Sequence, residues 1–145
     1  MSQAVLGVDV INSNATANTI ADVTGLSFPV TINKKYRFRF EIQYLAAATT
    51  TGSRFAINGP GGVMRYRSEY SLTTTTRTVN DGIATHDTPA LANASSAATN
   101  SNIAIIEGFY EATATGIVIA RFASEIASSA ITVKLGSIVY FQEIL

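Results

Sequence analysis

Two stretches of the chain alternate between apolar and polar side chains. Residues 36–44 read Tyr-Arg-Phe-Arg-Phe-Glu-Ile-Gln-Tyr, and residues 64–72 follow the same rule as Met-Arg-Tyr-Arg-Ser-Glu-Tyr-Ser-Leu. Because successive side chains of a β-strand point to opposite faces, this period of two predicts two half-buried strands. The aromatic and aliphatic positions are expected in the core, and the R-x-R-x-E positions of both strands are expected on the outer face.

Shorter apolar runs bounded by Gly, Asn, Ser and Thr indicate further strands along the whole chain, and no stretch has a helical period. A β-rich chain must cover or close its sheets to bury one face of each. We therefore expect a single domain with an all-β fold, a jelly-roll-like antiparallel β-sandwich. The additional predicted strands cover residues 19–23, 26–32, 53–58, 74–80, 103–112, 116–126, 130–135 and 137–144.

Three segments rich in Ala, Thr, Ser and Asn, residues 12–18, 46–52 and 93–102, are predicted to form surface loops. Residues 1–18 are interpreted in two ways: as an N-terminal arm that orders against a neighbouring molecule, or as an ordinary first strand through residues 4–11. Residues 19–145 are expected to form the β-sandwich domain.

Charge and composition remove several classes of function. Ten basic and ten acidic side chains among 145 residues give a formal net charge of zero. Nucleic-acid binding needs a basic excess to displace counterions from phosphates, so we expect no nucleic-acid partner. The absence of cysteine excludes thiol nucleophiles and thiolate metal sites. No apolar run of about 18 residues and no signal-like N-terminus occur, so we expect synthesis in the cytoplasm and no membrane partner.

Patterns that carry catalysis or bind metals are weak. His86 is the single histidine, and no G-x-S-x-G turn accompanies it, so we interpret it as a loop or interface residue. The four aspartates lack the spacing of a calcium loop. Glu107, Glu111 and Glu125 are the types of residue used in glycoside hydrolysis but are expected at solvated outer positions. We therefore expect no enzymatic activity, no metal and no cofactor.

The outer faces of the two alternating strands suggest a contact surface. If the strands paired with each other, Arg37, Arg39, Arg65 and Arg67 would align into a basic patch bordered by Glu41 and Glu69. Such a patch contacts a partner in one interpretation. In the other, it is a hydrated sheet face whose ion pairs contribute little to stability.

The C-terminal third carries a succession of motifs: TGIVIARFASE at residues 115–125, SSAITV at 128–133 and GSIVYF at 136–141. This succession resembles the closing strands of compact β-sandwich domains in tailed-bacteriophage virion proteins. The Y-R-F-R-F strand, the run TTTGSRFAINGP at 49–60 and the segment RSEYSLT at 67–73 are also similar to these proteins. The resemblance covers roughly residues 24–145. The closing strands are similar as well to jelly-roll heads of the C1q/TNF-like type, which trimerise through apolar and aromatic side chains.

The resemblance implies a structural role in a virion, and two such roles compete. One is a capsid decoration (cement) protein that binds the outer capsid surface and stabilises the shell. The other is the head domain of a tail fibre or spike that binds a host receptor or glycan. A fibre usually carries a shaft of Gly-X-Y or heptad repeats before its head, and this chain shows none, which favours decoration. A lectin and a virion-associated hydrolase are further alternatives.

On the decoration hypothesis, the protein is located on the capsid exterior and contacts the major capsid protein. We also expect self-association as a homotrimer or homodimer, with symmetry multiplying a modest interface. The candidate contacts lie in the N-terminal segment and on the arginine face: Val5, Leu6, Val8, Arg37, Arg39, Arg65 and Arg67.

Overall fold

A computed structural model describes residues 1–144 and shows strands and no helices within them. No helix that could cross a membrane is therefore found in this part of the chain. The strands are β1 (Ser2–Val5), β2 (Val10–Asn12), β3 (Ala21–Val30), β4 (Lys35–Ala46), β5 (Ser53–Asn58), β6 (Gly62–Ser71), β7 (Arg77–Ile83), β8 (Asn102–Ala112), β9 (Gly116–Ser124), β10 (Ile131–Val133) and β11 (Ile138–Ile144).

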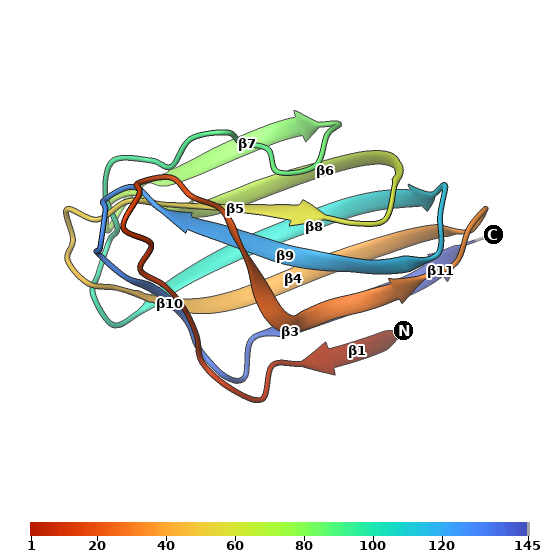
Figure 1. Cartoon of the computed structure of the whole chain (residues 1–145), viewed down its shortest axis with the longest axis horizontal. Coiled ribbons are helices and arrows are strands. Elements are labelled where there is room, and N and C mark those ends of the chain that lie inside the picture. The colour runs from red at the N-terminus through yellow and green to blue at the C-terminus, as the bar shows by residue number, and fades with distance from the viewer. Residues whose placement is uncertain (145) are drawn as a thin grey trace.

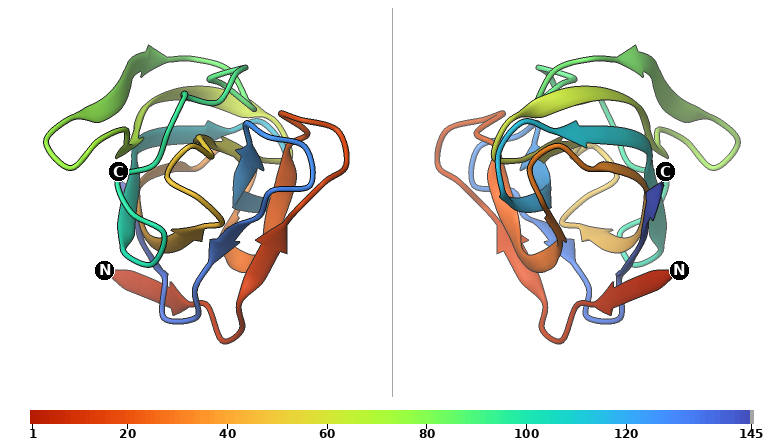
Figure 2. Two further views of the ribbon diagram at one scale, coloured as in Figure 1. Left: turned by 90° about the vertical axis from the view of Figure 1, so that its left-hand side faces the viewer. Right: turned by 90° about the vertical axis from the view of Figure 1, so that its right-hand side faces the viewer.

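The strands form two antiparallel sheets that pack into a sandwich (Figure 1). The large sheet has the order β1-β11-β4-β8-β6-β7, with β10 and β2 extending it beside β4, and the small sheet has the order β3-β9-β5. Early strands pair with late ones in nested fashion: β1 with β11, β3 with β9, and β4 with β8. This nesting is what results when one long antiparallel hairpin is rolled up, so the predicted jelly-roll-like sandwich is confirmed. The start of β1 and the end of β11 lie at the same end of the molecule (Figure 1), and on the same side of it when it is viewed along its long axis (Figure 2).

The core lies between the sheets and is rich in aromatic rings. The inward positions of β4 are buried as the alternation predicted, from Tyr36 to Tyr44. Phe28 from the small sheet packs against Phe38 and Phe40, with ring centroids 5.6 and 6.0 Å apart. Burial of these rings removes a large apolar area from water and is the main source of stability.

The two predicted strands at residues 19–23 and 26–32 form one strand, β3, interrupted by an irregularity between Asp22 and Ser27. Gly25 lies in this interval with φ of +96°, a conformation that favours glycine. The irregularity lets one strand change its register against β9 without ending. A turn-like composition therefore marked a bulge and not a strand end.

The N-terminal segment lies on the sandwich. β1 pairs with β11 and β2 pairs with β10, and between them Leu6 exchanges backbone hydrogen bonds with residues 136 and 137. Leu6 is only 1 % exposed and belongs to the core. The sequence-based assignment of Leu6 as a partner contact is therefore wrong, because its side chain is already covered by the protein itself.

The predicted surface loops at 46–52 and 93–102 are more buried than their composition indicated. Thr51, Ser96 and Asn102 are each at most 5 % exposed. Hydrogen bonds satisfy them: the Ser96 hydroxyl donates to the Thr51 carbonyl at 2.7 Å, and the Asn102 amide donates to the carbonyls of Tyr44 and Ala98. A polar segment can be buried when its groups find such partners.

Candidate functional site

The four arginines of the alternating strands share the outer face of the large sheet, but not through the predicted pairing. The structure places β8 between β4 and β6, so the two R-x-R-x-E strands are not neighbours. Each row of side chains across the face therefore has a central residue from β8. The two rows that contain the arginines are Arg39, Glu107 and Arg67, and Arg37, Phe109 and Arg65.

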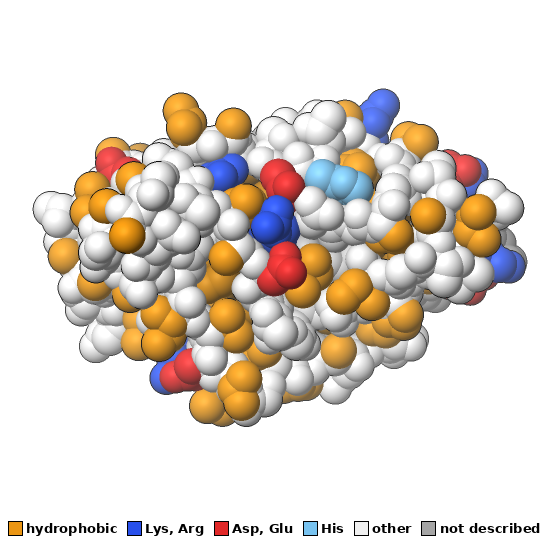
Figure 3. Space-filling model, in the orientation of Figure 1, with side chains coloured by type: hydrophobic (Ala, Val, Ile, Leu, Met, Phe, Trp, Pro, Cys, Tyr) orange, Lys and Arg blue, Asp and Glu red, His pale blue; other side chains and the backbone are white. Residues whose placement is uncertain are grey.

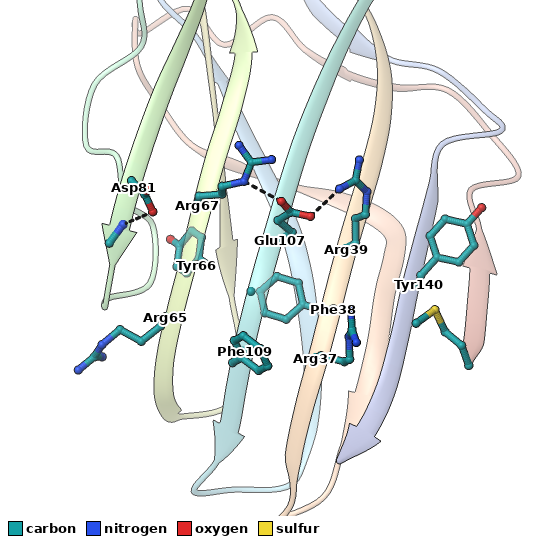
Figure 4. A pocket seen from close by; sticks show the side chains of 13 residues that line it. Arg37, Phe38, Arg39, Arg65, Tyr66, Arg67, Asp81, Glu107, Phe109 and Tyr140 are labelled. Carbon is teal, nitrogen blue, oxygen red and sulfur yellow. Dashed lines mark hydrogen bonds and ion pairs between the residues drawn. The ribbon is translucent and has the colours of Figure 1, made fainter.

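Glu107 forms an ion-pair clamp with the two arginines of its row (Figure 4). Arg39 Nη1 donates to Glu107 Oε2 at 2.5 Å, and Arg67 Nε donates to Glu107 Oε1 at 2.7 Å. Glu41 and Glu69 pair with Arg39 and Arg67 in turn, at 2.9 and 3.1 Å. The clamp holds these two guanidinium groups in fixed positions.

The clamp also affects the protonation of Glu107. Partial burial alone raises the pKa of this carboxyl, but hydrogen bonds from Arg67 and Arg39 outweigh that effect and hold the pKa below its ordinary value of 4.5. A carboxyl with a lowered pKa in the folded state stabilises the fold above the unfolded-state pKa. That contribution is lost as the pH falls through the folded-state value.

We predict that Glu107→Gln lowers the free energy of unfolding by about 1 kcal/mol at pH 7, because the substitution keeps the shape and removes the charge. The difference between the two proteins should shrink as the pH falls below 4.5 and through the lower folded-state pKa of Glu107, where its carboxyl becomes neutral. Urea unfolding at pH 7 and pH 3 tests this. Glu143→Gln is the matched control, since Glu143 is half exposed and makes one surface ion pair with Lys34. An equal decrease in the free energy of unfolding of both variants at pH 7 would contradict a special role for the clamp.

The second row presents an exposed aromatic ring between two cations. Phe109 is 57 % exposed on the outer face of β8. Arg37 and Arg65 flank it on β4 and β6, and no carboxylate among residues 1–144 lies within 4.0 Å of either guanidinium. In the described part of the chain, the Arg65 guanidinium donates only to the neighbouring carbonyl of Met64.

These rows form the floor of an open groove of about 710 Å³. Figure 4 shows Tyr140 of β11 at one side and Asp81 of β7 at the other, with the arginines and Phe109 between them. In Figure 2 the two edges of the large sheet, β7 and the N-terminal strand, project outward from the sheet. We call this hollow the outer groove. Its lining residues are Met1, Arg37, Phe38, Arg39, Arg65, Tyr66, Arg67, Asp81, Gly82, Glu107, Gly108, Phe109 and Tyr140.

A second surface lies where the N-terminal segment runs beside the β10–β11 turn. Val5, Val8, Ile11 and Leu135 are between 55 and 64 % exposed along this corner. Asp9 fixes it, since one carboxylate oxygen accepts the Leu135 N–H at 2.9 Å and the other pairs with the Lys134 ammonium group at 2.8 Å. Figure 3 shows hydrophobic side chains gathered at the lower edge of the molecule in this region. We call these four residues the apolar corner.

The residues considered for catalysis do not come together. His86 lies in a loop, as predicted, and its Nε2 is 2.9 Å from the Tyr110 hydroxyl; burial lowers its pKa. Asp87 pairs with Arg121 instead of His86. Glu111 pairs with Lys35, and Glu125 accepts the Gly52 N–H. Within residues 1–144, no three His, Cys, Asp or Glu side chains gather closely enough to hold a metal ion.

Sequence reasoning missed Phe109, Tyr140 and Leu135 as surface residues. The signal for Phe109 was present, because β8 places Glu107, Phe109 and Glu111 at alternate positions, and two solvated glutamates imply that the ring between them also points outward. No comparable pattern existed for Leu135, which lies outside any strand.

No family model and no curated protein matches this chain. Among solved structures, the crystal structure of the infectious bursal disease virus VP2 subviral particle has a TM-score of 0.28 and 10 % sequence identity. That alignment covers 97 % of this chain and spans 38 % of the VP2 chain.

Proposed function

We propose that this protein is a non-enzymatic structural protein of a tailed-phage virion, a decoration protein that binds the outer capsid surface and stabilises the shell. The observation that carries the proposal is the apolar corner. Val5 and Val8, two of the contacts expected from the sequence, lie in it together with Ile11 and Leu135. The ion pair of Asp9 with Lys134 and the buried side chain of Leu6 hold it rigidly on the sandwich.

A rigid apolar corner is suited to docking on another protein, because little conformational entropy is lost when it is covered. Covering each half-exposed side chain contributes about 1 kcal/mol at the usual value for apolar area. One copy then binds with modest strength. Many symmetry-related copies, each bridging neighbouring capsid proteins, would together strengthen the shell. The proposed partner is the major capsid protein, and self-association as a homodimer or homotrimer belongs to the same proposal.

The test uses heads from a phage mutant that lacks this protein, mixed with the purified chain and sedimented. We expect Val8→Asp and Leu135→Asp to weaken binding at least about tenfold, because each would place an unpaired carboxylate in an apolar contact. Thr74→Asp, an exposed position in the β6–β7 loop, is the matched control and should bind normally. Bound protein should also raise the temperature at which the heads release DNA.

Unchanged binding by both corner variants would reject the corner as the contact. The location of the protein in the virion separates the two structural roles. Density over the whole shell in a cryo-electron microscopy map supports decoration, whereas density confined to the tail tip or fibres supports the alternative, a head domain that binds a host receptor or glycan.

A further inference from the structure

The outer groove combines positive charge with exposed apolar surface. Its lining includes four arginines and, at one side, the carboxylate of Asp81. Glu107, Glu41 and Glu69 compensate the charges of Arg39 and Arg67, whereas no carboxylate among residues 1–144 lies within 4.0 Å of the guanidinium groups of Arg37 and Arg65, which flank Phe109. In a chain with no net charge, this is a local field that attracts an anionic group.

The side-chain types in the groove are those of protein–protein contacts. Phe, Tyr, Met and Arg are enriched in the centres of such contacts, whereas Lys, Glu, Asp, Ser and Ala are depleted. The lining contains Phe, Tyr, Met and Arg and has no Lys, Ser or Ala; its two acidic residues are Glu107, which is paired in the clamp, and Asp81 at one side. Arginine and tyrosine are also frequent among the residues whose truncation costs most binding energy.

The shape of the groove favours a narrow segment over a second copy of the chain. Two concave faces packed against each other would leave both hollows unfilled, which costs dispersion contacts. A single chain segment can enter a hollow of about 710 Å³ and reach its floor. There, the Phe109 ring offers apolar contact, and the two flanking guanidinium groups can each hold a carboxylate in bidentate geometry.

We propose that the outer groove binds an acidic segment of a partner protein, with an apolar side chain of the segment on Phe109 and carboxylates on Arg37 and Arg65. The clamp of Arg39, Glu107 and Arg67 forms a rigid floor beside this site. The inference rests on the proposed function only for the identity of the partner, which would then be the major capsid protein. The chemistry of the segment follows from the groove itself.

The test measures fluorescence anisotropy of a labelled short peptide in which aspartate alternates with leucine, added to the purified full chain. A peptide with lysine in place of aspartate is the charge-reversed probe and should not bind. We expect Arg37→Glu and Arg65→Glu each to weaken binding of the acidic peptide at least about tenfold, and Phe109→Ser several-fold. Lys34→Glu, which makes the same charge change outside the groove, should leave the binding unchanged.

Equal binding of both peptides, or no effect of the arginine variants, would overturn the proposal. If a glucuronate-containing oligosaccharide binds and the acidic peptide does not, with the same dependence on Arg37 and Arg65, the ligand of the groove is an anionic glycan and not a protein segment. If the protein dimerises in a concentration-dependent manner and these variants abolish the dimer, the ligand is a second copy of the chain. The peptide assay contains no heads, so its failure leaves the head-binding result with the corner variants unaffected, and the reverse also holds.

Discussion

Replacing Gly108 with alanine is expected to destabilise the fold by about 3 kcal/mol or more, which lowers the melting temperature by roughly 10 °C. Gly108 lies in β8 between Phe38 of β4 and Tyr66 of β6. A Cβ atom at this position would lie 2.6 Å from the Tyr66 Cα and would also overlap the carbonyl oxygen of Arg65. These are backbone atoms of the neighbouring strand, so no side-chain rotation relieves the overlap. β6 must move away from β8.

The same displacement would separate the row that contains Arg37, Phe109 and Arg65, so binding of the acidic peptide should also be lost. Gly7→Ala is the matched control, because no atom lies within 4 Å of the added methyl group and the φ angle of Gly7 is ordinary. Thermal unfolding followed by far-UV circular dichroism measures both variants. Equal melting temperatures for Gly108→Ala and the unmodified protein would show that the sheet accommodates the methyl group, contrary to the close packing seen here.

The alternation of β4 and β6 predicts most of their buried side chains; Ser71, an expected outer position that is 4 % exposed and hydrogen-bonded to the Tyr44 hydroxyl, is an exception. Tyr36, Phe40 and Tyr70 are all in the core, and Arg37 and Arg65 are exposed, as the period of two indicated. This part of the fold can be predicted from the sequence because the burial of one strand face depends on the local spacing of apolar residues along the chain. The all-β sandwich follows from repeating that pattern in short segments with turn residues between them.

The order of the strands could not be predicted from the sequence in the same way. The buried and exposed faces of both R-x-R-x-E strands follow from their residues, but nothing in those residues indicates that β8 separates the two strands. Pairing partners are chosen by packing among distant segments, and a strand with Glu107 between two arginines is stabilised there by charge. The arginine face was therefore predicted correctly as a face but with the wrong neighbours and without its central Phe109.

In the N-terminal segment, too, the sequence alone does not show which side chains are buried. Residues 4–8 read Ala-Val-Leu-Gly-Val, a run with no clear period, so the sequence does not distinguish buried Leu6 from exposed Val5 and Val8. The distinction arises from the backbone hydrogen bonds of Leu6 with the β10–β11 turn, which direct its side chain inward. Contacts between residues so far apart in the chain are fixed only by the assembled fold.

Deleting residues 1–18 is expected to unfold most of the protein at 37 °C. The deletion removes the buried side chain of Leu6, whose loss alone corresponds to about 2–5 kcal/mol for a leucine-to-alanine change. It also removes the buried amide of Asn12, which donates to the carbonyls of Thr19 and Phe122 at 2.9 Å, and the Asn18 carbonyl that accepts from buried Arg54. Total stabilities of single domains are about 5–15 kcal/mol, so these losses together approach the whole.

This expectation determines how the N-terminal segment must be tested. Loss of capsid binding after the deletion would follow from unfolding and would say nothing about the apolar corner, whereas Val8→Asp changes only an exposed side chain. Urea unfolding of the truncated protein, of Leu6→Ala and of Val8→Asp separates the two effects. We expect the free energy of unfolding to fall by most of its value in the truncated protein, by about 2–5 kcal/mol in Leu6→Ala and hardly at all in Val8→Asp. A truncated protein within about 1 kcal/mol of the full chain would restore the interpretation of residues 1–18 as a removable arm.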